Sequence, residues 1–170
     1  MPYFISYAIV YWLDVFIREE YKQIWIDSIK YCQQNKGLEV FGWCLMSSHA
    51  HMIIRSEHQA LEDIVRDFKK HTSLQIRQAI ENNPQESRKE WLLWMLKRAA
   101  GKNSNNTAFQ FWQQHNHPIE LNSNEKFLQK LTYIHNNPVA AGFVKQPQDW
   151  IYSSANGYEN NTGLLKLHYA

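Results

Sequence analysis

The order of two hydrophobic periodicities constrains the fold of this chain more than any other feature of its sequence. Segments whose apolar residues alternate predict strands, and segments whose apolar residues recur every three or four positions predict helices. From the N-terminus the order is strand, helix, strand, strand, helix, helix, strand, helix. The predicted strands cover 3–13, 38–46, 50–54 and 109–113, and the predicted helices cover 18–35, 61–80, 87–100 and 125–136.

This order is that of a split βαβ unit, and it predicts an α+β sandwich of the ferredoxin-like or RRM-like type. Such a fold has an antiparallel sheet with helices on one face, which leaves the other face for a ligand or for additional elements. We expect a polar loop at 101–106 and a mostly irregular tail after Val139. The 170 residues contain no repeat and no long linker, so one domain over 1–170 is expected.

Composition narrows the class of protein. Hydrophobic residues make up 44% of the chain, which excludes a disordered protein. The two cysteines, Cys32 and Cys44, form no Cys-x-x-Cys pair, and we expect two buried free thiols, with a disulfide between them as the alternative. No secretory signal pattern and no apolar run near the length of a membrane helix is present, so we expect a cytoplasmic protein without membrane contact.

The small net charge of +2 conceals a basic central segment. Residues 66–102 carry nine basic and four acidic side chains, whereas residues 1–65 carry five basic and eight acidic ones. A local excess of positive charge attracts polyanions. We therefore expect this segment to lie where a nucleic-acid strand would bind.

The most distinctive local motif is His49-Ala50-His51. Residues i and i+2 of a strand point to the same face, so the two imidazoles are expected to project side by side. Neutral imidazoles presented in this way are good ligands for a divalent metal. The alternative is that His49 and His51 are hydrogen-bonded polar residues of a strand without a ligand.

A second motif is Tyr133-Ile134-His135-Asn136-Asn137-Pro138. Tyr133 and Asn137 are four residues apart, so they share one face of the last predicted helix. A tyrosine hydroxyl can act as a nucleophile, and an amide oxygen can complete a metal site. Pro138 disfavours the helical conformation at Asn137, which predicts that the helix ends there. Alternatively, Tyr133 packs in the core and Asn137 caps a turn.

The basic segment contains five candidate contacts for DNA phosphates, with a solvated helix surface as the alternative for each. Contacts of this kind supply affinity without sequence readout and make binding salt-dependent. Aromatic side chains nearby can stack on bases, although most aromatic residues at helical or strand spacing belong to the core. The candidate phosphate contacts are Arg66, Lys69, Lys70, His71 and Arg98, and the aromatic residues are Trp91, Trp94, Phe109, Phe111 and Trp112.

Four motifs in this order, spread over nearly the whole chain, resemble those of the REP-associated tyrosine transposases. These proteins belong to the wider IS200/IS605 group of single-tyrosine HUH transposases. The motifs are Leu45-Met46-Ser47-Ser48-His49-Ala50-His51, Phe111-Trp112-Gln113-Gln114-His115-Asn116-His117-Pro118, Tyr133-Ile134-His135-Asn136-Asn137-Pro138-Val139 and Tyr152-Ser153-Ser154-Ala155.

The resemblance implies a metal-dependent enzyme that cleaves single-stranded DNA near hairpins and transfers the strand. By this resemblance His49, His51 and Asn137 hold Mg²⁺ or Mn²⁺, and Tyr133 attacks the phosphodiester to form a 5′-phosphotyrosine. The implied fold is the same ferredoxin-like sandwich, with the tyrosine on a C-terminal helix. Members of the family are typically homodimers and some act as monomers, so both states stay open.

One residue departs from the family pattern, because Ser48 stands where members usually have Asn before the first histidine. Both are small polar residues that can make the same turn hydrogen bond. Two other functions stay open from the sequence. One is a non-catalytic or domesticated RRM-like nucleic-acid-binding protein, and the other is a phosphodiesterase that uses water, in which Tyr133 is structural.

Overall fold

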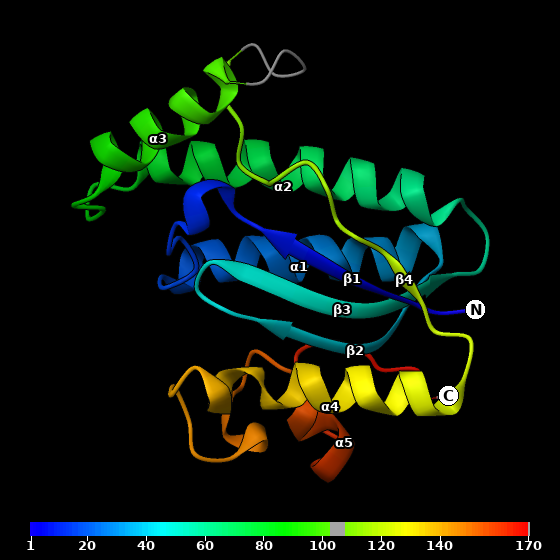
Figure 1. Cartoon of the computed structure of the whole chain (residues 1–170). Coiled ribbons are helices and arrows are strands. Elements are labelled where there is room, and N and C mark those ends of the chain that lie inside the picture. The colour runs from blue at the N-terminus through cyan, green and yellow to red at the C-terminus, as the bar shows by residue number, and fades with distance from the viewer. Residues whose placement is uncertain (103–107, 170) are drawn as a thin grey trace.

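A four-stranded sheet lies between helices in the computed structural model, which describes residues 1–102 and 108–169 (Figure 1). Most of the polar loop expected at 101–106 lies outside these residues. The elements, in chain order, are β1 (Tyr3–Ala8), η1 (Val10–Trp12), α1 (Glu19–Lys36), β2 (Leu38–Leu45), β3 (His49–Ser56), α2 (Leu61–Asn82), α3 (Lys89–Gly101), β4 (Ile119–Glu120), α4 (Asn124–Ala140), η2 (Pro147–Asp149) and α5 (Ala155–Asn160).

The sheet confirms the expected topology. Its strand order is β2-β3-β1-β4, and every neighbouring pair is antiparallel. β1 and β3 form the two central strands, with Ser6 opposite His51 and Ala8 opposite His49. This is the antiparallel sheet of a ferredoxin-like α+β sandwich.

Alternation along the central strands sorts their side chains to two faces. Ile5 and Tyr7 of β1 belong to a large core that also contains the buried residues of α1 and α2. Phe4 belongs to a second, smaller core formed with the buried residues of α4. Helices α1 and α2 therefore cover one face and α4 covers the other, as Figure 1 shows. The face that the sequence leaves free for an additional element is the one covered by α4.

The first strand is shorter than predicted, because it ends at Ala8 instead of continuing to Leu13. The chain turns at Tyr11 and Trp12, whose φ angles of 54° and 52° are incompatible with a strand. The amide of Val10 donates instead to the carbonyl of Phe111. Alternating aromatic and β-branched residues therefore predicted the strand but not its end.

The predicted strand at 109–113 is wrong. Within this segment only Trp112 makes a bridge, to Ile9, and the fourth strand is β4 at Ile119–Glu120. Phe111 and Trp112 are both buried although they are consecutive, which the alternation of a half-buried strand does not allow. Their rings fill the core beside Tyr7 and Phe16, so the segment is held by packing instead of by a strand ladder.

The tyrosine helix is longer than predicted, because α4 continues through Pro138 to Ala140. Asn137 therefore lies inside the helix and not at its end. The last turn is maintained by a hydrogen bond from the amide of Ala141 to the carbonyl of Asn137, and Pro138 is buried. Burial and this hydrogen bond outweigh the local bias against helix before proline.

The C-terminal segment is more ordered than the predicted irregular tail, since it contains η2 and α5. It also pairs with the outer edge of β2, where Ser153 bridges Cys44 and the amide of Leu45 donates to Tyr152. This pairing covers a sheet edge that would otherwise expose unpaired backbone groups. Cys32 and Cys44 are both free and buried, as predicted. Across the two described stretches, no helix combines the length and hydrophobicity needed to cross a membrane.

A buried carboxylate, Glu86, joins the start of α1 to the segment before α3. It accepts hydrogen bonds from Arg18 at 2.8 Å, Arg88 at 3.1 Å and the Tyr21 hydroxyl at 3.1 Å. Burial raises the pKa of Glu86, but the hydrogen bonds from Arg88 and Arg18 outweigh it and lower the pKa to about 2. The ionised group therefore stabilises the fold above its ordinary pKa of about 4.5, and this contribution disappears as the pH falls toward 2.

Replacing Glu86 by Gln is expected to lower the free energy of unfolding at pH 7 by about 3 kcal/mol, because the variant lacks the carboxylate whose pKa the fold lowers from 4.5 to about 2. The difference from wild type should shrink between pH 4.5 and pH 2, where wild type loses the same contribution. Urea unfolding at pH 7, 4 and 2.5 measures both. Glu159→Gln, at an exposed position on α5, is the control and should change little. Equal stability of Glu86→Gln and wild type at pH 7 would contradict this role.

Candidate metal and nucleophile site

The two histidines lie side by side at the start of β3, as their spacing predicted. Their ring centroids are 5.0 Å apart, and both face the side of the sheet that α4 covers. Ala50 between them is fully buried on the opposite face, against α1 and α2. His51 is 7% exposed and stacks on Phe4, whereas His49 is half-buried.

Both imidazoles are held by serine hydroxyls at Nδ1. Ser6 Oγ is 2.8 Å from His51 Nδ1, and Ser48 Oγ is 3.2 Å from His49 Nδ1. Ser48 therefore makes a polar contact at the position where the family pattern has Asn. In each ring the contact at Nδ1 fixes the orientation. It leaves His51 Nε2 for a ligand, whereas His49 Nε2 faces the Asn137 amide oxygen.

Burial keeps both histidines neutral. It lowers the pKa of His51 to about 3, with smaller contributions from His49 and Lys130. It also lowers the pKa of His49, against an opposing effect of the hydrogen bond with Asn137. A neutral imidazole retains the lone pair that a metal needs.

The tyrosine helix brings Asn137 and Tyr133 to the histidines. Asn137 Oδ1 lies 3.2 Å from His49 Nε2. The ring of Tyr133 meets His51 edge-on at 5.2 Å, and 49% of this residue is exposed to solvent. Tyr133 is therefore not a core residue, which was the alternative from the sequence. The four residues singled out from two distant motifs lie together on one face.

The chemistry of these donors fits a divalent cation. Imidazole nitrogens and an amide oxygen are donors that divalent cations accept, and His49 Nε2 and Asn137 Oδ1 lie close enough together, at 3.2 Å, to hold one ion. No cluster of three His, Cys, Asp or Glu side chains suited to a metal occurs among the residues the structure describes. A metal site there has to include a donor such as the Asn137 amide.

Lys130, Ser6 and Trp12 also lie at the site, but the sequence did not predict a role for them. Lys130, one turn before Tyr133, places Nζ 4.7 Å from the ring centroid of Phe4 and 5.7 Å from that of Tyr133. Helical spacing could have found Lys130, and strand alternation could have grouped Ser6 with Phe4. Trp12, whose ring lies 5.5 Å from that of His49, gave no signal because the turn at η1 was not predicted.

Four of the five predicted DNA contacts lie on α2, across the sheet from the histidines. Arg66 pairs with Asp63 and Asp67, and Lys69 donates to the Gln113 carbonyl and the Asn116 side chain. Burial lowers the pKa of Lys69 to about 8. Lys70 is exposed on the same helix. DNA contact by these residues stays a prediction, but they do not flank the histidines.

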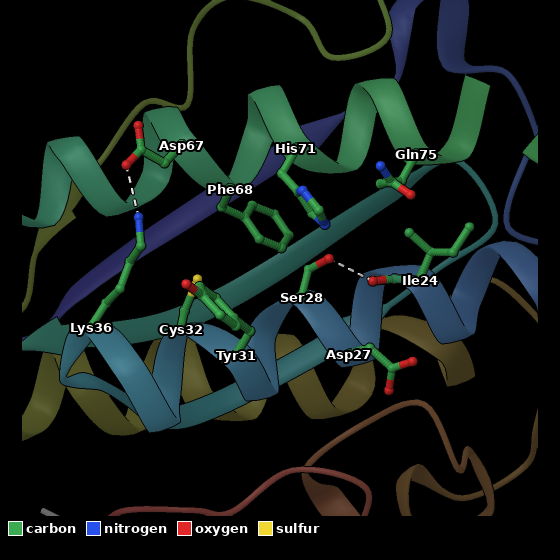
Figure 2. A pocket seen from close by; sticks show the side chains of 10 residues that line it. All are labelled: Ile24, Asp27, Ser28, Tyr31, Cys32, Lys36, Asp67, Phe68, His71 and Gln75. Carbon is green, nitrogen blue, oxygen red and sulfur yellow. Dashed lines mark hydrogen bonds and ion pairs between the residues drawn. The ribbon is translucent and has the colours of Figure 1, made fainter. Parts of the chain in front are cut away.

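His71 lines a groove of about 620 Å³ between α1 and α2 (Figure 2). In Figure 2 its ring points toward Phe68 and Ser28, on the side of α2 that faces α1. The groove has the Lys36–Asp67 ion pair at one end. It contains none of the residues of the histidine site and lies on the opposite face of the sheet. Arg98, the fifth predicted contact, is exposed on α3.

A hydrogen-bond network anchors the tyrosine helix to β2. His135 Nε2 lies 2.8 Å from Ser154 Oγ, which also accepts a hydrogen bond from the amide of Trp43 at 2.9 Å. The motif that contains Tyr133 and the motif at 152–155 therefore meet through the contact between His135 and Ser154. Burial lowers the pKa of His135 to about 4, so this link is made by a neutral imidazole.

Replacing Ser154 by Ala is expected to lower the free energy of unfolding by about 2 kcal/mol, because the buried Trp43 amide loses its acceptor. Urea unfolding monitored by circular dichroism measures the change. Ser73→Ala is the matched control, since the Ser73 hydroxyl bonds back to the Lys69 carbonyl of its own helix and should contribute little. Equal effects of the two substitutions would contradict an anchoring role for Ser154.

Known proteins similar to this chain were found both by sequence profile and by structure. The profile of the family described as "Transposase IS200 like" matches residues 9–107, more than half of the chain. Among solved structures, a REP-associated tyrosine transposase bound to a REP hairpin is 17% identical with a TM-score of 0.66, and the alignment covers 99% of this chain and 84% of that one. A protein from Deinococcus radiodurans proposed to be a transposase is 19% identical with a TM-score of 0.48, covering 80% and 89%. No curated protein sequence matches.

Proposed function

The chain belongs to the IS200-like transposase family, and from this premise we propose that it cleaves and rejoins single-stranded DNA with Tyr133 as the nucleophile. The observation that supports this proposal is the meeting of His49, His51, Asn137 and Tyr133 on one face of the sheet. A half-exposed tyrosine beside two neutral histidines suits a nucleophile better than a structural residue.

In the proposed reaction, Tyr133 Oη forms a bond to the phosphorus of the scissile phosphodiester. The bond from phosphorus to O3′ breaks, the phenol proton passes to solvent, and O3′ leaves as a hydroxyl after taking up a proton. The product is a 5′-phosphotyrosine and a strand with a free 3′-OH. Because the new linkage is also a phosphodiester, another 3′-OH can reverse the step and join two strands.

We propose that His49, His51 and Asn137 hold one Mg²⁺ or Mn²⁺ ion. When bound, such an ion supplies positive charge that stabilises the phosphate oxygens during displacement. The protein's own contribution is to keep both imidazoles neutral and oriented through the Ser6 and Ser48 hydroxyls. α4 holds the Asn137 amide and the Tyr133 hydroxyl on one helix face, so ligand and nucleophile are positioned together.

We propose single-stranded DNA flanking a hairpin as the substrate. The relative of known structure with the same fold is bound to a REP hairpin, and the IS200-like family is one of transposases. The test incubates wild-type protein with labelled hairpins that carry single-stranded flanks, in the presence of Mg²⁺ or Mn²⁺. A covalent protein–DNA band on a denaturing gel and a second product that a polymerase can extend from its 3′-OH are expected.

Two other outcomes would overturn this assignment. Cleavage without a covalent band would indicate a phosphodiesterase that uses water, and metal-independent binding without cleavage would indicate a non-catalytic nucleic-acid-binding protein. Either result would leave the family assignment unchanged, because that assignment rests on the sequence match over residues 9–107.

A further inference from the structure

The solvent-facing side of α3 has an unusual composition. Trp91, Trp94, Arg98 and Lys102 are spaced three or four residues apart, so they form one stripe along the helix. Trp91 is 48% exposed and Trp94 is 54% exposed, although an amphipathic helix normally turns polar side chains to solvent. The buried residues Leu92 and Leu96 lie on the other side of the helix and account for its packing.

Two aromatic side chains and then two basic ones follow one another along the stripe, and the basic side chains lie against aromatic rings. The Arg98 guanidinium lies 5.3 Å from the ring centroid of Trp94, and Lys102 Nζ lies 5.9 Å from that of Tyr11 in η1. Residues 89–102 carry four cations against one acid, Glu90. A row of exposed rings and cations is complementary to bases and phosphates of a single strand, since every base has a face that stacks on an aromatic ring.

The stripe leads to the histidine site. Tyr11 and Trp12 are consecutive, and the ring of Trp12 meets His49 edge-on at 5.5 Å. Figure 1 shows α3 and the C-terminal end of α4 at the same end of the sheet, where β1 ends and β3 begins. A strand that follows α3 toward Tyr11 would therefore arrive at His49.

The backbone at this junction is strained. Tyr11 and Trp12 both adopt left-handed φ angles, 54° and 52°, which are unfavourable for residues other than glycine. Trp12 is nevertheless 58% exposed, so burial of its ring does not compensate for the strain. Strain of this kind concentrates at binding and catalytic sites, where it presents a side chain in a fixed position.

We propose that six residues of α3, its C-terminal cap and η1 form one binding surface for the single-stranded DNA that flanks the scissile phosphate. This inference rests on the proposed function. It adds the path of the DNA strand across the protein and the groups of the strand, bases and phosphates, that the protein contacts. Bases stack on the exposed rings, and phosphates contact the cations between them. We name the surface the aromatic track; its residues are Trp91, Trp94, Arg98, Lys102, Tyr11 and Trp12.

Binding of two fluorescent probes tests the track without any need for cleavage. One is a 15-nucleotide oligothymidylate, and the other has the same backbone with abasic residues. Wild type is expected to bind oligothymidylate at least about tenfold more tightly, because its bases stack on the exposed rings and the abasic probe has no bases to stack. Trp94→Ala and Trp12→Ala should each weaken oligothymidylate binding about five- to thirtyfold and leave the affinity for the abasic probe unchanged.

One variant tests the contribution of a cation in the track, and another tests whether an exposed ring elsewhere on the protein has the same effect. Arg98→Gln should weaken binding of both probes equally and reduce the slope of affinity against salt by about one. Tyr31→Ala removes an equally exposed ring from α1, on the other face of the sheet from the histidines, and should bind both probes as wild type does. All four substitutions are at exposed positions, and thermal melting checks their folding.

The failures of the two proposals are distinguishable. If Trp94→Ala and Trp12→Ala bind both probes like wild type, or if wild type does not prefer bases over the abasic backbone, the aromatic track is wrong. If the track variants behave as expected but no covalent adduct forms with any hairpin substrate, the proposed function is wrong and the binding surface stands.

Discussion

Replacing Tyr133 by Phe is expected to abolish the covalent protein–DNA adduct and to reduce cleavage by at least about 10³-fold, the scale of loss when a nucleophile is removed. The substitution deletes only the hydroxyl. The ring contacts with His51 at 5.2 Å and Phe4 at 6.0 Å remain, so the fold and the metal ligands should not change. A denaturing gel with labelled hairpin substrate measures the adduct, and fluorescence anisotropy should show DNA affinity within about threefold of wild type.

Tyr31→Phe is the matched control, because Tyr31 is similarly exposed but lies on α1, across the sheet from the histidines. It should form the adduct at the wild-type rate. An adduct of normal yield with Tyr133→Phe would show that another residue is the nucleophile. Loss of DNA binding together with cleavage would instead indicate that the Tyr133 hydroxyl holds the substrate.

The arrangement of the histidines could be predicted because it depends on strand geometry alone. A two-residue spacing in a strand puts His49 and His51 on one face whatever the rest of the fold does. The four-residue spacing of Tyr133 and Asn137 works in the same way on a helix. That the strand face and the helix face meet follows from long-range packing of α4 on β2, where Leu131 comes close to Gly42. No local pattern indicates that contact.

Two segments differ from their predicted structure, and tertiary packing is the physical reason for both. Phe111 and Trp112 have strand-forming side chains, but both are buried in the core beside β1 and α2. Pro138 favours a helix end, but burial against the sheet keeps the helix intact. In each case the local preference is on the scale of a kcal/mol or a few, and burial of large apolar side chains exceeds it.

The charge of the basic segment likewise predicted a partner but not the surface that would bind it. Residues 66–102 are contiguous in sequence, yet the fold divides them between two places. α2 carries Lys69 and Lys70 across the sheet from the histidines, whereas α3, which carries Arg98, lies at the end of the sheet where β3 begins (Figure 1). A net charge per segment therefore indicates a nucleic-acid partner but does not locate the binding surface.

Replacing His49 by Ala is expected to reduce cleavage by at least about 10²-fold while DNA affinity stays within about threefold of wild type. The substitution removes a neutral imidazole whose Nε2 lies 3.2 Å from Asn137 Oδ1, so the proposed site loses one of three ligands. Changing a group that only hydrogen-bonds to a metal ligand typically reduces metal affinity or activity about 10–100-fold, and loss of a ligand should cost at least as much. Binding should persist because phosphate and stacking contacts lie elsewhere, on the aromatic track. Cleavage of labelled hairpin DNA at several Mn²⁺ concentrations measures the first effect, and anisotropy measures the second.

Titration of Mn²⁺ by electron paramagnetic resonance separates loss of the metal from loss of chemistry. Wild type and Tyr133→Phe should both bind one Mn²⁺ ion, because the tyrosine is not a proposed ligand, whereas His49→Ala should bind it at least about tenfold more weakly. His58→Ala is the matched control, since His58 is an exposed histidine with no contact to the site. If His49→Ala binds Mn²⁺ like wild type, His49 is not a ligand. If it loses the metal and still cleaves at the wild-type rate, the metal does not take part in cleavage.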